Sequence, residues 1–321
     1  MNLKVLLILI CCLYLNQGMA QKQTVYFLKN SGSLVQSRDS ADYIRIVSEP
    51  ESETDLYDVK EYYKNGVLKL TGKSSMIYPR SLTGQCMSYF PSGKKKQYAN
   101  YKLGHLDGDV YDYYPNGRVY LYKKYIYDKN NYFDTNYLIL ACNDSTGREL
   151  TVDGNGSYIG YDAAFKEIQE KGDVKAGLKD GKWTGNNGDQ KNYITFSEEY
   201  AGGKLVSGQS TDRDNKTVNY TEQDHEPQYK GGIGAFYQYL ISNIWPTRIP
   251  IETKNMVVVS FIVEKDGIIT DAKIARTSND DLSKQALKVL KLSSKWVPGL
   301  QHGRAVSAQY SVPVITTTYI R

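Results

Sequence analysis

Few side chains in this sequence have the types and spacing that catalysis or metal binding requires. The three histidines, His105, His225 and His302, lie far apart, and no His-Glu-x-x-His or paired-cysteine spacing accompanies them, so a zinc site is not indicated. Residues 72–74 (Gly-Lys-Ser) resemble the end of a phosphate-binding loop, but Gly66 lies one position too early for that motif. Because the candidate groups do not converge, we predict no enzyme, no catalytic residue, no metal and no cofactor.

Cys86 and Cys142 are the two cysteines that lie outside residues 1–20. An even pair of cysteines in an oxidising compartment can form a disulfide. The closed loop would stabilise the fold by roughly 4 kcal/mol in the chain-entropy account. Two buried thiols in strands are an equal alternative, and the sequence leaves both open.

Residues 1–20 have the pattern of an export signal. Lys4 gives a short basic start, residues 5–15 form an apolar run, and small residues precede a cleavage site after Ala20. The apolar run has about half of the roughly 20 residues that a membrane-spanning helix needs. We therefore predict a cleaved signal peptide and a periplasmic, envelope-associated protein; an uncleaved inner-membrane anchor is the alternative.

Composition favours β-structure and argues against a nucleic-acid partner. The chain has 29 tyrosines against 7 phenylalanines. Tyrosine suits half-buried strands, because its ring packs on the sheet while its hydroxyl stays in water. The net charge of +5 comes from 40 basic and 35 acidic residues. This excess is small and scattered, so the basic footprint of a nucleic-acid-binding protein is missing.

A degenerate repeat occupies the first part of the chain. An aromatic pair precedes a turn that ends in Asn-Gly or Ser-Gly at residues 62–66, 89–93 and 113–117. Each copy predicts a strand, a tight turn and a second strand. A second signature, Gly-x-x-Asp-Gly, occurs at 104–108 and 177–181 and predicts a hairpin turn at Asp-Gly. Stacked units of this length bury an apolar face only against their neighbours.

These motifs resemble MORN-type repeats, together with the aromatic residues Tyr111 and Trp183 that follow the second signature. The resemblance implies a single-layer β-meander of hairpin repeats, which such proteins use for contacts with proteins or lipids. We place this repeat domain at residues 21–208. The polar composition of residues 209–230 then predicts a linker to a C-terminal module at 231–321.

The C-terminal module combines helical and strand patterns. Phe236, Tyr239 and Leu240 recur at helical spacing, and Trp245-Pro246 stops that helix. The expected elements are a helix at 235–244, strands at 256–264 and 268–276 joined by a turn at 265–267, a second helix that begins at Asp280 or Asp281, and a final strand at 306–314. The simplest packing is an α+β fold with a three-stranded antiparallel sheet backed by two helices.

This module resembles the C-terminal domain of TonB-family proteins, in the form found in Bacteroidetes. Five sequence blocks occur in the family's order over about residues 224–316. They are Pro227 through Gly232; Trp245-Pro246; Val257 through Gly267, which ends in Asp266-Gly267; Ala286 through Leu290; and Trp296-Val297-Pro298-Gly299 with Gly303-Arg304 and Val306. Two positions depart from the family: Trp245 replaces the usual tyrosine, and Asn255 replaces a glycine before the first strand.

The resemblance implies a domain that binds an extended segment of TonB-dependent outer-membrane receptors by adding it as a strand to the sheet edge. Pro313 indicates that the final strand is an edge, because proline in a sheet is confined largely to edge strands. The residues expected to flank the docked segment are Ser307, Gln309, Tyr310, Ser311 and Pro313. For Tyr310, burial in the core is an equal alternative.

A complete energy transducer of this family needs a membrane anchor that contacts the proton-motor proteins, and a proline-rich spacer. This sequence predicts neither, because its nine prolines are spread over the whole length. We expect a receptor-binding protein linked to transmembrane transport. The alternatives are a full transducer with an uncleaved anchor, and a structural envelope repeat protein. The oligomeric state stays open, a homodimer included.

Overall fold

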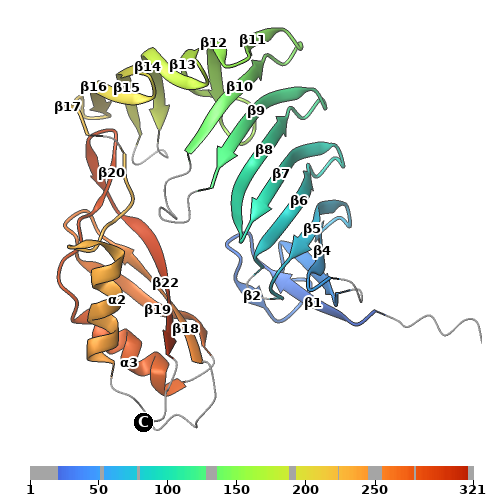
Figure 1. The fold of residues 1–321 in the computed structure, drawn as a ribbon, viewed down its shortest axis with the longest axis vertical. Coiled ribbons are helices and arrows are strands. Elements are labelled where there is room, and N and C mark those ends of the chain that lie inside the picture. The colour runs from blue at the N-terminus through green and yellow to red at the C-terminus, as the bar shows by residue number, and fades with distance from the viewer. Residues whose placement is uncertain are drawn as a thin grey trace, which may run out of the picture. The chain divides into compact units, whose positions relative to one another are not determined.

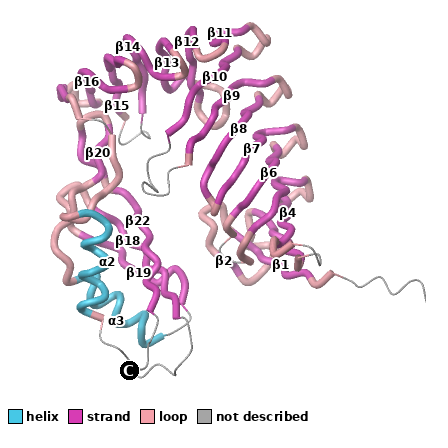
Figure 2. Tube along the Cα trace, in the orientation of Figure 1, coloured by secondary structure: helices cyan, strands magenta, loops and turns pink. Residues whose placement is uncertain are grey.

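The computed structural model describes residues 21–50, 54–77, 80–127, 136–187, 193–222, 224–244, 255–277 and 280–316. The segment 1–20 and the predicted helix stop at Trp245-Pro246 lie outside these ranges. The described chain is mostly β-strand, in a long antiparallel meander, and its two helices lie in the C-terminal part (Figure 1, Figure 2). Within the described ranges, no helix has the length and apolar character needed to cross a bilayer.

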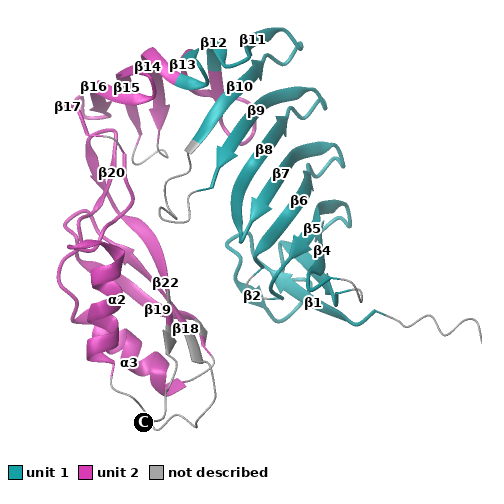
Figure 3. Ribbon diagram, in the orientation of Figure 1, with its two compact units in different colours: residues 1–158, 174–178 teal, residues 159–173, 179–321 magenta. Residues whose placement is uncertain are grey.

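The chain divides into two compact units (Figure 3). The first comprises residues 1–158 and 174–178, and the second comprises 159–173 and 179–321. This division differs from the predicted one, in which a boundary fell at residues 209–230. The strands that precede the C-terminal module belong to the same unit as the module itself.

The first unit is built from successive hairpins. Strand β1 pairs antiparallel with both β2 and β3, and from β3 to β12 each strand pairs antiparallel with the next. The bounds are β1 (Gln23–Leu28), β2 (Leu34–Val35), β3 (Tyr43–Ser48), β4 (Tyr57–Tyr63), β5 (Leu68–Ser74), β6 (Leu82–Tyr89), β7 (Lys95–Lys102), β8 (His105–Tyr113), β9 (Val119–Ile126), β10 (Asn136–Asn143), β11 (Glu149–Val152) and β12 (Asn155–Tyr161). The last residues of β12, from 159 onward, belong to the second unit.

The aromatic-x-x-Gly motif forms the same turn in all three copies, as predicted. The closing glycines Gly66, Gly93 and Gly117 have φ of 84°, 84° and 96°, a region that favours glycine. In each copy the glycine N–H donates to the carbonyl of the aromatic residue three positions earlier, at N···O distances of 2.9, 2.8 and 2.8 Å. The repeat is therefore a repeat of backbone geometry as well as of sequence.

The second signature turns at its first glycine and not at Asp-Gly, as was predicted. The tight turn lies at Leu103-Gly104, where φ is 51° and 87°, and again at residues 176–177. A two-residue hairpin loop with a type I′ turn requires positive φ at both of its central residues. The predicted Asp107-Gly108 lies inside β8 instead, beside a register shift between β7 and β8. Its glycine serves a bulge, because a bulge also needs a residue with positive φ.

Apolar side chains and two thiols fill the buried face of the first unit. Val47, Val59, Leu70, Leu82 and Cys86 form one buried cluster. Cys86 and Cys142 are both buried, and no disulfide joins them. Burial raises the pKa of the Cys86 thiol to about 11, so it stays protonated at neutral pH. The structure corresponds to the alternative of two buried thiols.

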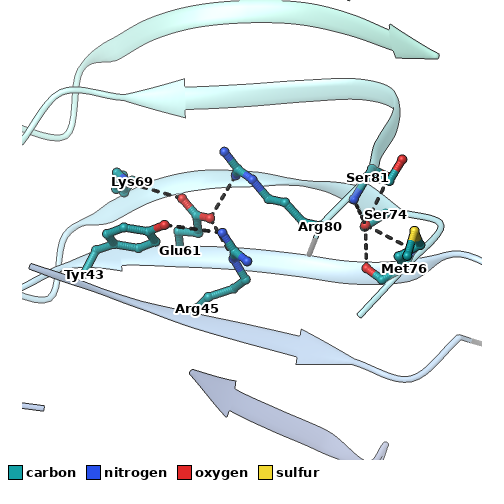
Figure 4. A network of polar contacts seen from close by, with 8 residues as sticks. All are labelled: Tyr43, Arg45, Glu61, Lys69, Ser74, Met76, Arg80 and Ser81. Carbon is teal, nitrogen blue, oxygen red and sulfur yellow. Dashed lines mark hydrogen bonds and ion pairs between the residues drawn. The ribbon is translucent and has the colours of Figure 1, made fainter. Parts of the chain in front are cut away.

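A buried carboxylate of the first unit is shared by three basic side chains (Figure 4). Glu61 on β4 accepts bonds from Arg45 Nε at 2.9 Å, Arg80 Nη1 at 2.8 Å and Lys69 Nζ at 3.3 Å. Glu61 is 0% exposed, and Lys69 also lies over the Tyr43 ring, with Nζ 3.3 Å from its centroid. Burial lowers the pKa of Lys69, and the Glu61 charge opposes that shift. The carboxylate therefore allows basic side chains to pack inside the meander.

The second unit contains its own run of antiparallel strands, β14 (Leu178–Asn187), β15 (Ile194–Ala201), β16 (Lys204–Asp212) and β17 (Thr217–Tyr220). The predicted linker at 209–230 is therefore wrong over much of its length, because residues 209–212 and 217–220 are strands. The polar composition misled the prediction. Alternate side chains such as Gln209 and Asn219 face solvent, while Ser210 and Tyr220 are buried.

The C-terminal module has the predicted α+β fold. It runs α2 (Gly232–Asn243), β18 (Asn255–Val263), β19 (Ile269–Thr277), α3 (Asp280–Lys291), β20 (Gly299–Gln301), β21 (Arg304–Val306) and β22 (Ala308–Thr316). Its three-stranded sheet has the order β19-β18-β22, and both flanking strands are antiparallel to β18. A separate two-stranded sheet, β20-β21, was not predicted.

The module's helices follow from simple sequence signals. Asp280 and Asp281 lie in the first turn of α3, and Lys288 and Lys291 in its last turn, so both ends complement the helix dipole. Its apolar stripe packs with α2 and the inner faces of β18 and β22 in one core. The fully or nearly buried members include Phe236, Leu240, Val257, Val259, Phe261, Val263, Leu282, Ala286, Leu290, Trp296 and Val312.

Candidate functional site

Strand β22 forms one edge of the module's sheet. It pairs with β18 without a register shift from Val263↔Ala308 to Asn255↔Thr316. Alternate side chains face opposite ways: Tyr310, Val312 and Val314 are buried, whereas Gln309 and Ser311 are exposed. The strand thus places an apolar row in the core and a polar row outside.

Two exposed residues, Ser307 just before β22 and Gln309 within it, bond through their side chains to β18 or to the residue that follows it. The Ser307 hydroxyl donates to Glu264 Oε2 at 2.6 Å, and the Gln309 amide donates to the Ser260 hydroxyl at 2.9 Å. The hydroxyls of Ser307 and Thr270 hold the pKa of Glu264 below its ordinary value. These bonds keep the polar row ordered along the sheet.

Tyr310 is part of an aromatic core under β22. Its ring lies 5.3 Å from Trp296 and 5.8 Å from Phe261, centroid to centroid, and the residue is 8% exposed. Burial raises the pKa of its hydroxyl to about 12. Trp296 also meets Phe236 at 4.8 Å and Tyr229 at 5.5 Å, both edge to face. For Tyr310 the structure therefore gives the core alternative.

The Asp266-Gly267 turn braces this aromatic core. The Asp266 carboxylate accepts the Ile268 N–H at 3.0 Å, and Gly267 has φ 81°, as the predicted turn requires. The Gly267 carbonyl accepts the Trp296 N–H at 2.9 Å. A Cβ on Gly267 would lie 2.1 Å from the Trp296 carbonyl oxygen. The hairpin can approach the tryptophan backbone this closely only with glycine at the turn.

Gly267→Ala is expected to lower the free energy of unfolding of the C-terminal module by about 2–3 kcal/mol, from positive-φ strain and the backbone clash. Gly234→Ala is the matched control. Gly234 lies in α2 with nothing within 4 Å of an added Cβ, so alanine should raise stability by about 0.5–1 kcal/mol. Urea titration followed by the helix signal at 222 nm measures both. Effects of the same sign would contradict the assigned role of the turn.

The motif residues after Trp296 lead into the β20-β21 hairpin. Gly299 begins β20 and is buried, with Val306 and Pro227 both near the position that a Cβ would take. Pro298 precedes it and is partly buried. The hairpin contacts the end of the β14–β17 meander, which sequence reasoning missed.

A buried carboxylate, Glu198 on β15, lies at the centre of that contact. It accepts bonds from His302 Nδ1 at 2.8 Å and Tyr220 at 2.7 Å on Oε1, and from Tyr200 at 3.0 Å on Oε2. The His302 ring stacks on Phe196, with centroids 3.9 Å apart. Gly-x-x-Asp-Gly and Gly303-Arg304 were visible as motifs, but nothing in them paired His302 with Glu198.

The ionisation of this cluster is set by opposing effects. Burial favours a higher pKa for Glu198, but hydrogen bonds from His302 and Tyr220 outweigh it and hold the pKa below its ordinary 4.5. Burial and the Glu198 charge raise the pKa of both Tyr200 and Tyr220, which stay protonated donors. Among the described residues, no group of three or more His, Cys, Asp or Glu side chains is placed to hold a metal ion. The bonds to Glu198 have the pattern of a buried structural network.

A lowered carboxyl pKa in the folded state makes stability depend on pH. The stabilisation from Glu198 is present above its unfolded pKa and is lost as pH falls through the folded value. We expect the free energy of unfolding to fall between about pH 5 and pH 3, and Glu198→Gln to flatten that decline. Denaturant titrations across this range, in wild type and variant, measure it. An equal slope in both proteins would show that Glu198 does not carry the effect.

Comparison with known proteins gives a match only within the C-terminal module. A search of curated proteins gives no match to this chain. A family model, described as Gram-negative bacterial TonB protein C-terminal, matches residues 254–315, which run from β18 through β22 and leave out α2. Domains of this family are non-enzymatic, TonB-family proteins are associated with the cell envelope, and their C-terminal domains interact with outer-membrane receptors. The β18–β22 region of this chain is thus similar to the TonB C-terminal family.

Proposed function

We propose that this protein binds the periplasmic segment of TonB-dependent outer-membrane receptors by adding that segment as a strand along β22. The observation that carries the proposal is the place of β22 at one end of the β19-β18-β22 sheet. An edge strand can pair with an extended peptide through its backbone, which gives affinity, while alternating side chains give specificity.

The register of β22 indicates which backbone groups a docked segment would meet. Pro313 lies opposite Val258 and has no N–H to donate. A regular antiparallel ladder accommodates it at a non-hydrogen-bonded pair, with the missing donor on the outer side. Alternation then directs the N–H and C=O groups of Ser311 and Gln309 outward. These two residues are the expected centre of the binding edge.

Docking along this edge would leave the core intact. Tyr310, Val312 and Val314 keep their side chains inside the module, so an incoming strand meets the exposed polar residues Gln309 and Ser311. Their short or flexible side chains offer little steric obstruction. The proposal therefore needs no partial unfolding of β22, and binding should be limited by the fit of the guest segment.

The meander and the N-terminal segment extend the proposal. The recurring turns at Gly66, Gly93 and Gly117 support a MORN-like array that carries the module in the periplasm after removal of residues 1–20. In that arrangement the chain acts as an adaptor for receptors and their transport cargo. N-terminal sequencing of the protein from its own envelope tests the localisation: a start at Gln21 is expected, and retention of Met1 would favour an anchored transducer.

Ser311→Pro tests the edge directly. It removes one outward N–H while keeping the strand extended, so we expect at least about a tenfold weaker affinity for a receptor segment. The probe is a synthetic peptide covering the periplasmic N-terminal extension of a TonB-dependent receptor, titrated into residues 21–321 by calorimetry.

Ser311→Ala is the matched control, because it removes the hydroxyl and keeps the backbone donor. Its affinity should stay within about twofold of wild type. Equal affinities for the proline and alanine variants would show that the guest does not pair with the outer side of β22.

A further inference from the structure

In the sequence, the β20-β21 hairpin lies between Trp296 of the aromatic core and the proposed binding edge. It follows Trp296 closely in sequence, and a single residue, Ser307, separates the end of β21 from the start of β22. Its two strands pair with each other and not with the three-stranded sheet. Its side chains reach the terminal strands β15–β17 instead, within the same compact unit.

Arg304 makes the most extensive of these contacts. Its guanidinium donates from Nε to the Ser210 hydroxyl at 2.9 Å, from Nη1 to Asp212 Oδ2 at 2.9 Å, and from Nη2 to the Ser210 carbonyl at 3.2 Å. A further bond joins Nη2 to the Lys216 carbonyl. The guanidinium thus holds β16 at two residues and the β16–β17 turn at a third. A planar fork with several donors suits this task better than a lysine would.

The hairpin tip fits the sheet by shape as well as by hydrogen bonds. The Ser210 hydroxyl donates to the His302 carbonyl at 2.8 Å, and the His302 N–H donates to Asp224 Oδ1 at 2.7 Å. A Cβ on Gly303 would lie 2.5 Å from the Tyr220 ring. Together with the Glu198–His302 pair, these contacts surround the tip with groups from β15, β16 and β17.

The segment between β17 and α2 bonds through its backbone to the hairpin and to the residues just before it. His225 and Leu300 exchange backbone bonds of 3.1 and 2.9 Å, and Gln228 and Val297 exchange bonds of 2.9 and 2.7 Å. The hairpin is therefore held between this segment and the terminal strands. Through the hairpin, the segment that leads into α2 and the start of β22 are both connected to β15–β17.

We propose that the Gly299–Val306 hairpin is a clamp that couples the binding edge to the terminal strands of the meander. The start of β22 is placed by the clamp, so a guest strand bound at β22 stabilises the contacts of Arg304 and His302 with β15–β17. Conversely, opening the clamp releases the first residues of β22 from the meander while the three-stranded sheet persists. This inference rests on the proposed function only where it speaks of a guest.

Hydrogen exchange of the full mature chain, residues 21–321, tests the coupling without any guest. Arg304→Ala should speed amide exchange by about tenfold or more in two places together, the hairpin 299–306 and the strands 208–220. Exchange in β18 and α3 should change little, which shows that the module remains folded. Gln209→Ala is the matched control, because its side chain bonds to Asn219 on the opposite, exposed face of β16.

Adding the receptor peptide then distinguishes a failure of the clamp from a failure of the proposed receptor binding. In the wild type, saturation with the receptor peptide should slow exchange at 208–220 as well as at β22, whereas in Arg304→Ala only β22 should respond. No binding to wild type would overturn the proposed function and leave the guest-free result to decide on the clamp. Faster exchange in the hairpin with unchanged exchange at 208–220, or the same remote protection in both proteins, would overturn the clamp.

Discussion

Replacing Trp296 by alanine is expected to lower the free energy of unfolding of the C-terminal module by about 3–5 kcal/mol, a large part of the total for a small domain. Trp296 is 3% exposed and contacts Phe236, Phe261, Tyr310 and Tyr229. Truncation would leave a cavity where α2, β18 and β22 meet. Because β22 loses the ring under Tyr310, the proposed binding edge should become mobile as well.

The matched variant is Trp296→Phe. Within the described residues, no acceptor lies within hydrogen-bonding reach of the buried Trp296 Nε1, so phenylalanine leaves no acceptor unsatisfied and removes only volume. Its cost should be about half that of alanine or less. Urea unfolding followed at 222 nm reports on the module, since α2 and α3 are the helices of the described chain. A loss below about 1 kcal/mol for alanine would mean that the aromatic core is loosely packed.

Removing the Glu61 carboxylate should destabilise the first unit by a similar amount. Glu61→Ala leaves Arg45, Lys69 and Arg80 without their shared counter-charge in a site where Glu61 itself is fully buried. Breaking a buried ion pair by deleting one partner typically costs about 3–5 kcal/mol. The pKa of Lys69 should fall further in this variant. Burial already lowers that pKa, and the Glu61 charge that opposes the shift would be gone.

Asp58→Ala is the control for Glu61, from the same strand. Asp58 pairs with Lys73 at 3.6 Å, and their side chains are 35% and 44% exposed. Such exposed pairs contribute under about 1 kcal/mol. Guanidinium titration with hydrogen exchange in β3–β5 as the readout compares the two variants. If both carboxylates cost the same, the network in Figure 4 would not be the stabilising feature described above.

Local patterns were enough to predict most of the C-terminal module. The alternation of Val257, Val259, Phe261 and Val263 predicted β18, because side chains on a strand alternate between core and outside. Asp266-Gly267 predicted the hairpin through the backbone angle that glycine permits. These signals act over a few residues, so they survive without knowledge of the tertiary structure.

The clamp could not be predicted in the same way. Its strands have three residues each, too few to show a period. Arg304 and Asp212, which bond to each other, are 92 positions apart in the sequence. Likewise, the polar residues 209–220 looked like a linker, because half of each strand faces solvent and the buried half includes Ser210, a polar residue satisfied by Arg304 and by the hairpin.

The proposed binding site was likewise predictable only in part. The edge position of the final strand followed from Pro313, and the structure places β22 at one end of the sheet order. Burial of Tyr310 depended on where Trp296 would lie, and that depends on the Gly267 turn far away in sequence. Side-chain roles at an edge are thus decided by tertiary contacts, whereas the edge itself can be recognised from backbone chemistry.

The most direct test of the account is amide exchange at single-residue resolution on the isotope-labelled chain, with and without the receptor peptide. If a guest strand pairs with the outer side of β22, the amides of Gln309 and Ser311 should change from rapid to slow exchange when the peptide is added, while the outer amides of β19 stay as they were. Unchanged exchange at both β22 residues in the presence of bound peptide, or protection that appears along β19 instead, would contradict it.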